Sequence, residues 1–176
     1  IGGFADKYSD QVKSLSFIAP AGFGKVQTSI PFFMKIPGVI EWAMHVLADR
    51  FYGSAISSET AHSNDPLSIN EEEFQQLFSF QVQFKGFRES LASTMRNFNL
   101  FDAREMFEKV AAKNIPSIAI WGDNDGIVSY KGAETYSEIF HEGKVITIED
   151  GTHDITYRQP SDVLEAIKIF LASQIS

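Results

Sequence analysis

Two short stretches decide the fold of this chain: Ile118-Ala-Ile-Trp-Gly-Asp-Asn-Asp-Gly-Ile-Val128 and Val145-Ile-Thr-Ile-Glu-Asp-Gly-Thr-His-Asp154. Each begins as a β-branched, apolar run and ends abruptly in polar residues, which is typical of strands buried on both faces of a parallel sheet. In open α/β sheets the chemistry lies beyond the carboxyl ends of the strands. Asp125 and His153, one after each strand, are therefore predicted to be partners, like the acid and the base of a nucleophilic triad.

The composition is that of an ordinary globular domain. The 176 residues are enough for one domain with a substantial core, and 44% of them are apolar. A formal net charge of −8 and the lack of a basic stripe exclude nucleic acid as an expected partner. No apolar run reaches the length of about 18 residues that a transmembrane segment needs. We expect a cytoplasmic location, and the first residue, Ile1, suggests that the N-terminus of the encoded protein is missing.

Strand and helix patterns occupy the two ends of the chain, and helical patterns fill its middle. Parallel strands are predicted at residues 12–19, 117–121 and 144–148, and helices at 130–140 and 161–172. The middle contains helical patterns at 36–50, 71–84, 86–97 and 102–113, with Asn70 and Asp102 as predicted starts. The last helix is predicted to bury one stripe: Val163, Leu164, Ile167, Phe170 and Leu171. The fold class is therefore α/β, with a core of residues 1–22 and 112–176 and a helical insert of residues 23–111.

This layout resembles the C-terminal two-thirds of an α/β-hydrolase. The stretch Trp121-Gly122-Asp123-Asn124-Asp125 is similar to the family's tryptophan-glycine-x-x-aspartate pattern, and Gly151-Thr152-His153 to its glycine-x-histidine pattern. Pro160 stands where the family often starts its last helix. The resemblance implies that the three strands are strands six, seven and eight, that residues 23–111 form a lid, and that Asp125 and His153 are the catalytic acid and base. We expect no cofactor.

The chain departs from the family's pattern at three places. Thr152 stands where glycine is common, Arg158 stands where an acidic residue is common, and no Gly-x-Ser-x-Gly nucleophile elbow occurs. Gly2 and Gly3 could follow an elbow directly, but a place within a helix packed on the sheet is favoured. The nucleophile, the oxyanion loop and strands one to five are then expected upstream. The chain alone is expected to be inactive, and its first strand would leave an open sheet edge through which it could self-associate.

Other candidate residues have simpler explanations. Asp123-x-Asp125-Gly126 faintly resembles a calcium loop, but Ile127 replaces the third oxygen ligand, so no metal is expected. The remaining histidines, which lack ligand spacing, are expected to be structural or exposed: His45, His62 and His141. Most phenylalanines lie in the insert, which would suit an apolar substrate, but the favoured explanation is that a small helical insert needs large side chains for its own core. They are Phe23, Phe32, Phe33, Phe51, Phe74, Phe78, Phe80, Phe84, Phe87, Phe98, Phe101 and Phe107.

Three functions stay open at this point. The favoured one is a serine hydrolase that cleaves a small-molecule carboxylic ester, or a similar acyl substrate, with an apolar group. The second uses an aspartate nucleophile, as the resembling epoxide hydrolases and dehalogenases do, but their lids supply tyrosines and the insert holds only Tyr52. The family's carbon–carbon bond hydrolases often have an aromatic residue where this chain has Asp154. The third is a ligand-binding remnant without catalysis.

Overall fold

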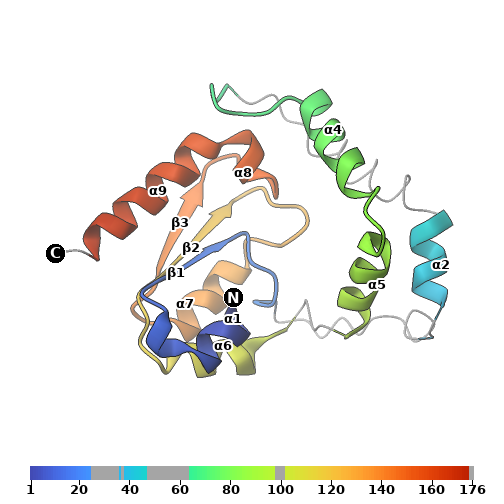
Figure 1. Cartoon of the computed structure of the whole chain (residues 1–176). Helices are drawn as coiled ribbons and strands as arrows, with labels where there is room; N and C mark the ends of the chain where they lie inside the picture. The colour runs from blue at the N-terminus through green and yellow to red at the C-terminus, as the bar shows by residue number, and fades with distance from the viewer. Residues whose placement is uncertain (25–35, 37, 47–63, 98–101, 175–176) are drawn as a thin grey trace. The chain divides into compact units, whose positions relative to one another are not determined.

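The computed structural model describes residues 1–24, 36, 38–46, 64–97 and 102–174. The chain forms two compact units. The first comprises Ile1–Gln27, Ser63–Ser68 and Phe101–Ser176, and the second comprises Thr28–His62 and Ile69–Leu100. The first unit contains a sheet flanked by helices, and the described part of the second is helical (Figure 1).

Three parallel strands form the sheet in the order β1 (Leu15–Ile18), β2 (Ser117–Gly122) and β3 (Lys144–Ile148). β2 pairs with both neighbours, so the carboxyl ends of all three strands point to the same edge. The direction and the strands match the sequence prediction, except that β1 is shorter than residues 12–19. Ser9–Gln11 form a short 3-10 helix before it, and Ala19 has a φ of 40° in the left-handed region, which ends the strand.

Helices cover both faces of the sheet (Figure 1). The helices α1 (Gly2–Lys7), α6 (Arg104–Ala111) and α7 (Gly132–Ile139) pack on one face, and α9 (Pro160–Ser173) packs on the other. β2 is buried along its whole length, and its side chains alternate between the two cores. Ala119 and Trp121 lie in the cluster with α6 and α7, whereas Ile118 and Ile120 lie in the cluster with α9. An apolar strand without a polar face is the sequence signal of this position.

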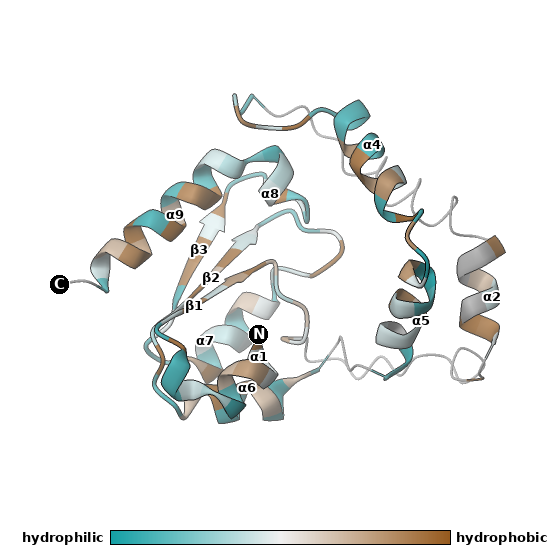
Figure 2. Cartoon of the chain, viewed as in Figure 1, coloured by the Kyte–Doolittle hydropathy of each residue, from teal (hydrophilic) through white to brown (hydrophobic). Residues whose placement is uncertain are grey.

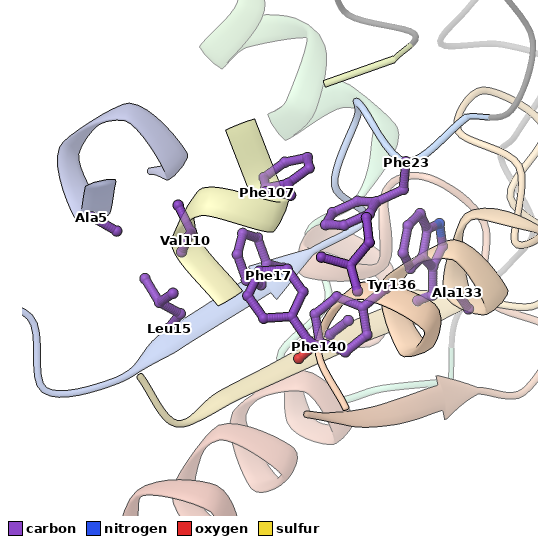
Figure 3. Close-up of a cluster of buried hydrophobic side chains, with 12 residues drawn as sticks. Ala5, Leu15, Phe17, Phe23, Phe107, Val110, Ala133, Tyr136 and Phe140 are labelled. Carbon is purple, nitrogen blue, oxygen red and sulfur yellow. The ribbon is translucent and has the colours of Figure 1, made fainter. Parts of the chain in front are cut away.

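Aromatic rings fill the core between the sheet and helices α6 and α7 (Figure 3). Phe17 of β1 lies among four other rings, whose centroids are 5.5 to 5.9 Å from its own: Phe23, Phe107, Tyr136 and Phe140. Phe23 and Phe107 stack with their centroids 4.0 Å apart. The sequence predicts these two phenylalanines in the insert, but in the structure they belong to the core of the sheet unit. Phe23 also pairs with Asp102 through an isolated antiparallel bridge.

One buried polar pair lies on this face. Ser117 Oγ and Tyr136 Oη are 2.7 Å apart, and both residues are buried. Burial raises the pKa of Tyr136 to about 12, although the hydrogen bond with Ser117 acts in the opposite direction.

Helix α1 approaches α6 closely because Gly2 has no side chain. A Cβ at Gly2 would lie 2.5 Å from Met106 Cε, whereas a Cβ at Gly3 would meet no atom within 4 Å. The sequence predicts both glycines within a helix, and the structure confirms that they lie in α1. The partner differs from the prediction, because the close contact of Gly2 is with α6 and not with the sheet.

The last helix, α9, covers its face of the sheet with a narrower stripe than predicted. Val163 and Phe170 are buried and Ile167 is partly buried. Leu164 and Leu171 are 43% and 44% exposed, so these two members of the predicted stripe lie at its border. A single helix on a small sheet buries only the side chains that point directly at the strands.

The described helices of the second unit are α2 (Val39–Val46), α4 (Glu71–Gln81) and α5 (Phe87–Asn97). Asn70 and Glu73 form a capping box at the start of α4, since the side chain of each accepts a hydrogen bond from the backbone N–H of the other. The first turn of α4 is hydrophilic and apolar side chains follow it (Figure 2). Gly86, with a φ of 87°, precedes α5 in a conformation that favours glycine.

The segment Ser63–Ser68 belongs to the first unit although its neighbours in sequence belong to the second. Asp65 Oδ2 accepts a hydrogen bond from Ser161 N–H, and Asp65 Oδ1 accepts one from the Ser161 hydroxyl, each at 2.8 Å. Asp65 therefore caps the start of α9. Desolvation raises the pKa of Asp65, but the hydrogen bonds from Leu67 and Ser161 outweigh it and lower the pKa below its usual value.

Candidate active site

The two predicted partners, Asp125 and His153, meet beyond the carboxyl ends of β2 and β3. His153 Nδ1 lies 3.0 Å from Asp125 Oδ2. The Asp125 side chain is fully buried, whereas the His153 side chain is 34% exposed. An ionised carboxylate only accepts hydrogen bonds, so Nδ1 of the imidazole is the donor. This contact fixes the tautomer and the orientation of the ring.

The carboxylate of Asp125 is held by its own loop. Its Oδ1 accepts hydrogen bonds from Ile127 N–H at 2.9 Å and from Val128 N–H at 2.7 Å. Trp121 Nε1–H donates to Val128 O at 2.9 Å, which closes the loop against the last residues of β2. A buried carboxylate needs such donors, and here they leave Oδ2 directed at the histidine.

Two glycines bring the acid loop and the histidine loop into backbone contact. A Cβ at Gly122 would lie 2.1 Å from Gly151 O, and a Cβ at Gly151 would lie 2.9 Å from Gly122 Cα. Asn124 N–H donates to Gly151 O at 3.0 Å. The two loops can therefore approach each other only because neither position carries a side chain.

Two further hydrogen bonds fix the acid loop to β3 and its end. Asp123 N–H donates to Ile148 O at 3.2 Å, and the hydroxyls of Tyr130 and Thr147 lie 2.6 Å apart. Asp123 is itself exposed. Its hydrogen bond to Ile148 is made by the main chain, so Asp123 supports the loop through its backbone.

The chain is similar to known proteins in sequence and in fold. No family model matches the chain. A curated relative, Lipase 3 from Moraxella sp. (strain TA144), is 24% identical over 95% of this chain and 50% of its own length. The crystal structure of bromoperoxidase from Bacillus anthracis matches 97% of this chain and 64% of its own chain, with a TM-score of 0.68 and 19% identity. A thermophilic esterase from Thermogutta terrifontis matches 99% of this chain and 61% of its own, with a TM-score of 0.66 and 17% identity.

The fold is that of an α/β-hydrolase. The similarity confirms the fold class predicted from the sequence, and it extends over nearly the whole chain. The chain spans about half the length of the curated relative that it matches.

Within this α/β-hydrolase fold, the histidine is followed by a short helix that the sequence analysis did not predict, α8 (Ile155–Arg158). Its first residue, Ile155, is fully buried in the core beneath α9. Asp154 accepts hydrogen bonds from the Thr152 hydroxyl and from Arg158 Nε, the latter at 3.0 Å. The sequence contains one signal for the ion pair, since an acid and a base spaced four residues apart can pair on a helix.

The other residues considered from the sequence lie away from this pair or outside the description. His141 is exposed and follows α7, and His45 lies in α2 with a side chain that is not described. His62 lies outside the described residues. Among the described residues, no group of three His, Cys, Asp or Glu side chains is arranged to hold a metal ion. None of the described helices is long and apolar enough to cross a membrane.

A cavity of about 640 Å³ lies at the opposite end of the strands from the candidate site. The first residues of β2 and β3, Ser117 and Lys144, line it together with Glu142 and Gln174, and neither Asp125 nor His153 does. Its position at the amino ends of the strands separates it from the chemistry expected of an open α/β sheet. The candidate site therefore rests on the two loops and not on this cavity.

Proposed function

We propose that this chain supplies the acid, the base and a helical lid of a serine hydrolase that cleaves carboxylic esters with an apolar acyl group. The observation that carries the proposal is the 3.0 Å contact between His153 Nδ1 and the fully buried carboxylate of Asp125. Two backbone N–H groups hold that carboxylate in place. The α/β-hydrolase fold and the similarity to a lipase and an esterase support acyl transfer as the reaction.

In this mechanism the imidazole moves one proton at each step. Asp125 keeps the proton of His153 on Nδ1, so Nε2 takes the proton of the serine hydroxyl as its oxygen attacks the ester carbonyl carbon. The buried carboxylate stabilises the imidazolium that forms. The tetrahedral intermediate then collapses, Nε2 gives its proton to the leaving alcohol, and an acyl-enzyme remains. Water, deprotonated by the same nitrogen, attacks the acyl carbon to form a second tetrahedral intermediate. Its collapse breaks the bond to the serine oxygen, which takes the proton back from Nε2, and the carboxylic acid leaves.

The nucleophile is proposed to come from a segment outside these residues. The sequence contains no Gly-x-Ser-x-Gly motif, which carries the serine on a strained turn at the top of the sheet in this fold. The donors that would stabilise the oxyanion are assigned to the same outside segment.

The preference for an apolar acyl group is supported by the helices of the second unit. They leave several large apolar side chains exposed: Trp42 and Val46 on α2, and Leu77 and Phe80 on α4, with Phe84 shortly after it. The rings of Phe80 and Phe84 contact each other edge to face, with their centroids 5.1 Å apart. Side chains of this kind line pockets for acyl and aryl groups.

The proposal is tested by turnover of p-nitrophenyl acetate, butyrate and octanoate in the full-length gene product. We expect His153→Ala to lower kcat by about 10⁴- to 10⁶-fold and Asp125→Asn by about 10⁴-fold, because a wrongly held tautomer cannot accept the serine proton. The matched control is His141→Ala, which removes an exposed histidine that lines the cavity at the opposite end of the strands and should leave turnover unchanged.

Labelling with a fluorophosphonate identifies the nucleophile, and the adduct is expected on a serine. Full turnover by the His153→Ala protein would contradict the mechanism. Hydrolysis of styrene oxide without serine labelling would instead favour the aspartate nucleophile of an epoxide hydrolase. The absence of both turnover and labelling would favour a ligand-binding remnant.

A further inference from the structure

The loop that carries His153 contains a hydrogen-bonded network made of residues at which the sequence departs from the patterns it resembles. Thr152 stands where glycine is common, Asp154 where an aromatic residue is frequent in one branch, and Arg158 where an acidic residue is common. In the structure Thr152 and Arg158 each contact Asp154. Asp154 Oδ1 accepts from the Thr152 hydroxyl, and Asp154 Oδ2 accepts from Arg158 Nε at 3.0 Å.

The network spans the histidine in sequence. Thr152 is the residue before His153 and Asp154 is the residue after it. The hydrogen bond between their side chains therefore connects the residues on both sides of the histidine. The main-chain carbonyl of Asp154 also accepts from Tyr157 N–H at 2.7 Å and from Arg158 N–H at 3.0 Å. Asp154 is thus bonded through both its side chain and its backbone to the end of α8.

The surroundings make these bonds stronger than ordinary surface contacts. The side chains of Arg158 and Asp154 are only 14% and 23% exposed, and pairs screened from water contribute more than fully exposed pairs. A four-residue helix such as α8 has almost no stability of its own, because the first turn costs more conformational entropy than its hydrogen bonds return. Side-chain contacts must therefore stabilise α8 and the chain segment beside His153.

We propose that Thr152, Asp154 and Arg158 are positioning residues for His153, and that they replace as a set the residues common at these positions. They touch no reacting atom. They restrain the main chain on both sides of the imidazole so that Nδ1 stays within reach of Asp125. The assignment rests on the proposed function insofar as His153 is taken as the base, although the restraint on the ring exists whatever the ring does.

The test compares single variants with a matched ion pair elsewhere. The variants are Asp154→Ala, which removes the shared acceptor, and Asp154→Asn, which keeps an oxygen acceptor. The control is Glu105→Gln, because Glu105 and Lys109 form an ion pair of the same four-residue spacing on α6, with an N–O distance of 2.8 Å. Circular dichroism and a thermal melt establish that each variant is folded at the temperature of the measurement.

The first readout is solvent exchange of the His153 Nδ1 proton, followed by ¹⁵N NMR in the full-length gene product. We expect Asp154→Ala to speed this exchange about tenfold or more, Asp154→Asn to speed it less, and Glu105→Gln to leave it unchanged. The second readout is ester turnover, where Asp154→Ala should lower kcat by about tenfold with little change in KM, as expected when a reacting group is misplaced and substrate binding is intact.

The two readouts separate the failure of this inference from the failure of the proposed function. Equal exchange in Asp154→Ala and in the unaltered protein would overturn the positioning role, whatever the turnover. Faster exchange in Asp154→Ala together with no turnover in the unaltered protein would support the positioning role and refute the hydrolase function. A KM increase with unchanged kcat would overturn the positioning role in favour of a contact with substrate.

Discussion

Replacing Gly122 by alanine should separate the acid loop from the histidine loop. The new Cβ would lie 2.1 Å from Gly151 O, whereas a carbon and a carbonyl oxygen in contact are about 3.3 Å apart. The two backbones must therefore move apart by about 1.2 Å. Starting from 3.0 Å between Asp125 Oδ2 and His153 Nδ1, a shift of this size takes the pair beyond hydrogen-bond distance. Neither atom of the clash belongs to a flexible side chain, so no rotamer change relieves it.

The expected costs follow from these distances. A misplacement of about 1 Å at a reacting group lowers kcat/KM by about 10²-fold. Overpacking of a tight backbone contact destabilises the fold by about 1 to 3 kcal/mol, which corresponds to a Tm lower by about 2 to 12 °C for a chain of this size.

Both quantities are measurable in the full-length gene product, by turnover of p-nitrophenyl butyrate and by a thermal melt. Gly3→Ala is the matched control, because a Cβ at Gly3 meets nothing within 4 Å and alanine favours the helix α1. The reasoning would be refuted by a Gly122→Ala protein with the Tm and the turnover of the unaltered protein, since the two loops would then tolerate a side chain between them.

Three further outcomes follow from the contacts described above. The pKa of Asp65 is lower in the folded chain than its ordinary value of 3.8. The ionised carboxylate therefore stabilises the fold at neutral pH, and this stabilisation is lost as the pH falls through the lowered pKa. In Asp65→Asn, the Tm should decrease less steeply as the pH falls. The pKa of Tyr136 is raised from 10.0 to about 12. The stabilisation of the fold by the protonated tyrosine is therefore lost as the pH rises from 10.0 to about 12. In Tyr136→Phe, the Tm should decrease less steeply over this alkaline range. Among the described strands, β1 pairs with β2 alone, so its other edge offers unpaired N–H and C=O groups. The 176-residue chain should self-associate through this edge, and a monodisperse monomer on size exclusion would refute this.

The parts of the fold that follow from short stretches of sequence were predictable. Lys144–Ile148 is a strand with the predicted bounds, and Ser117–Gly122 extends the predicted strand by one residue. Both runs are β-branched and end in turn residues, so local preference and burial agree. The contact of Asp125 with His153 follows from the same logic, since parallel neighbours bring their loops to one edge.

The contacts that depend on distant parts of the chain were not predictable. Nothing in the sequence near Asp65 indicates that it caps α9, because the two residues in contact are 96 positions apart. Phe23 and Phe107 could not be assigned to the sheet by composition, since apolar residues serve any core equally. The close approach of Gly122 to Gly151 could not be predicted for a related reason: whether a position requires glycine depends on the atoms that surround it in the fold.

The return of Ser63–Ser68 to the first unit divides the insert into two loops. Each loop is tied to the sheet unit at both of its ends, one ending and the other beginning at the segment that Asp65 fastens to α9. The two loops are nevertheless coupled to each other, because α2 of the first loop contacts α5 of the second within one compact unit. The chain therefore joins the second unit to the first at both ends of each loop, and the middle segment is held to α9 by the hydrogen bonds between Asp65 and Ser161.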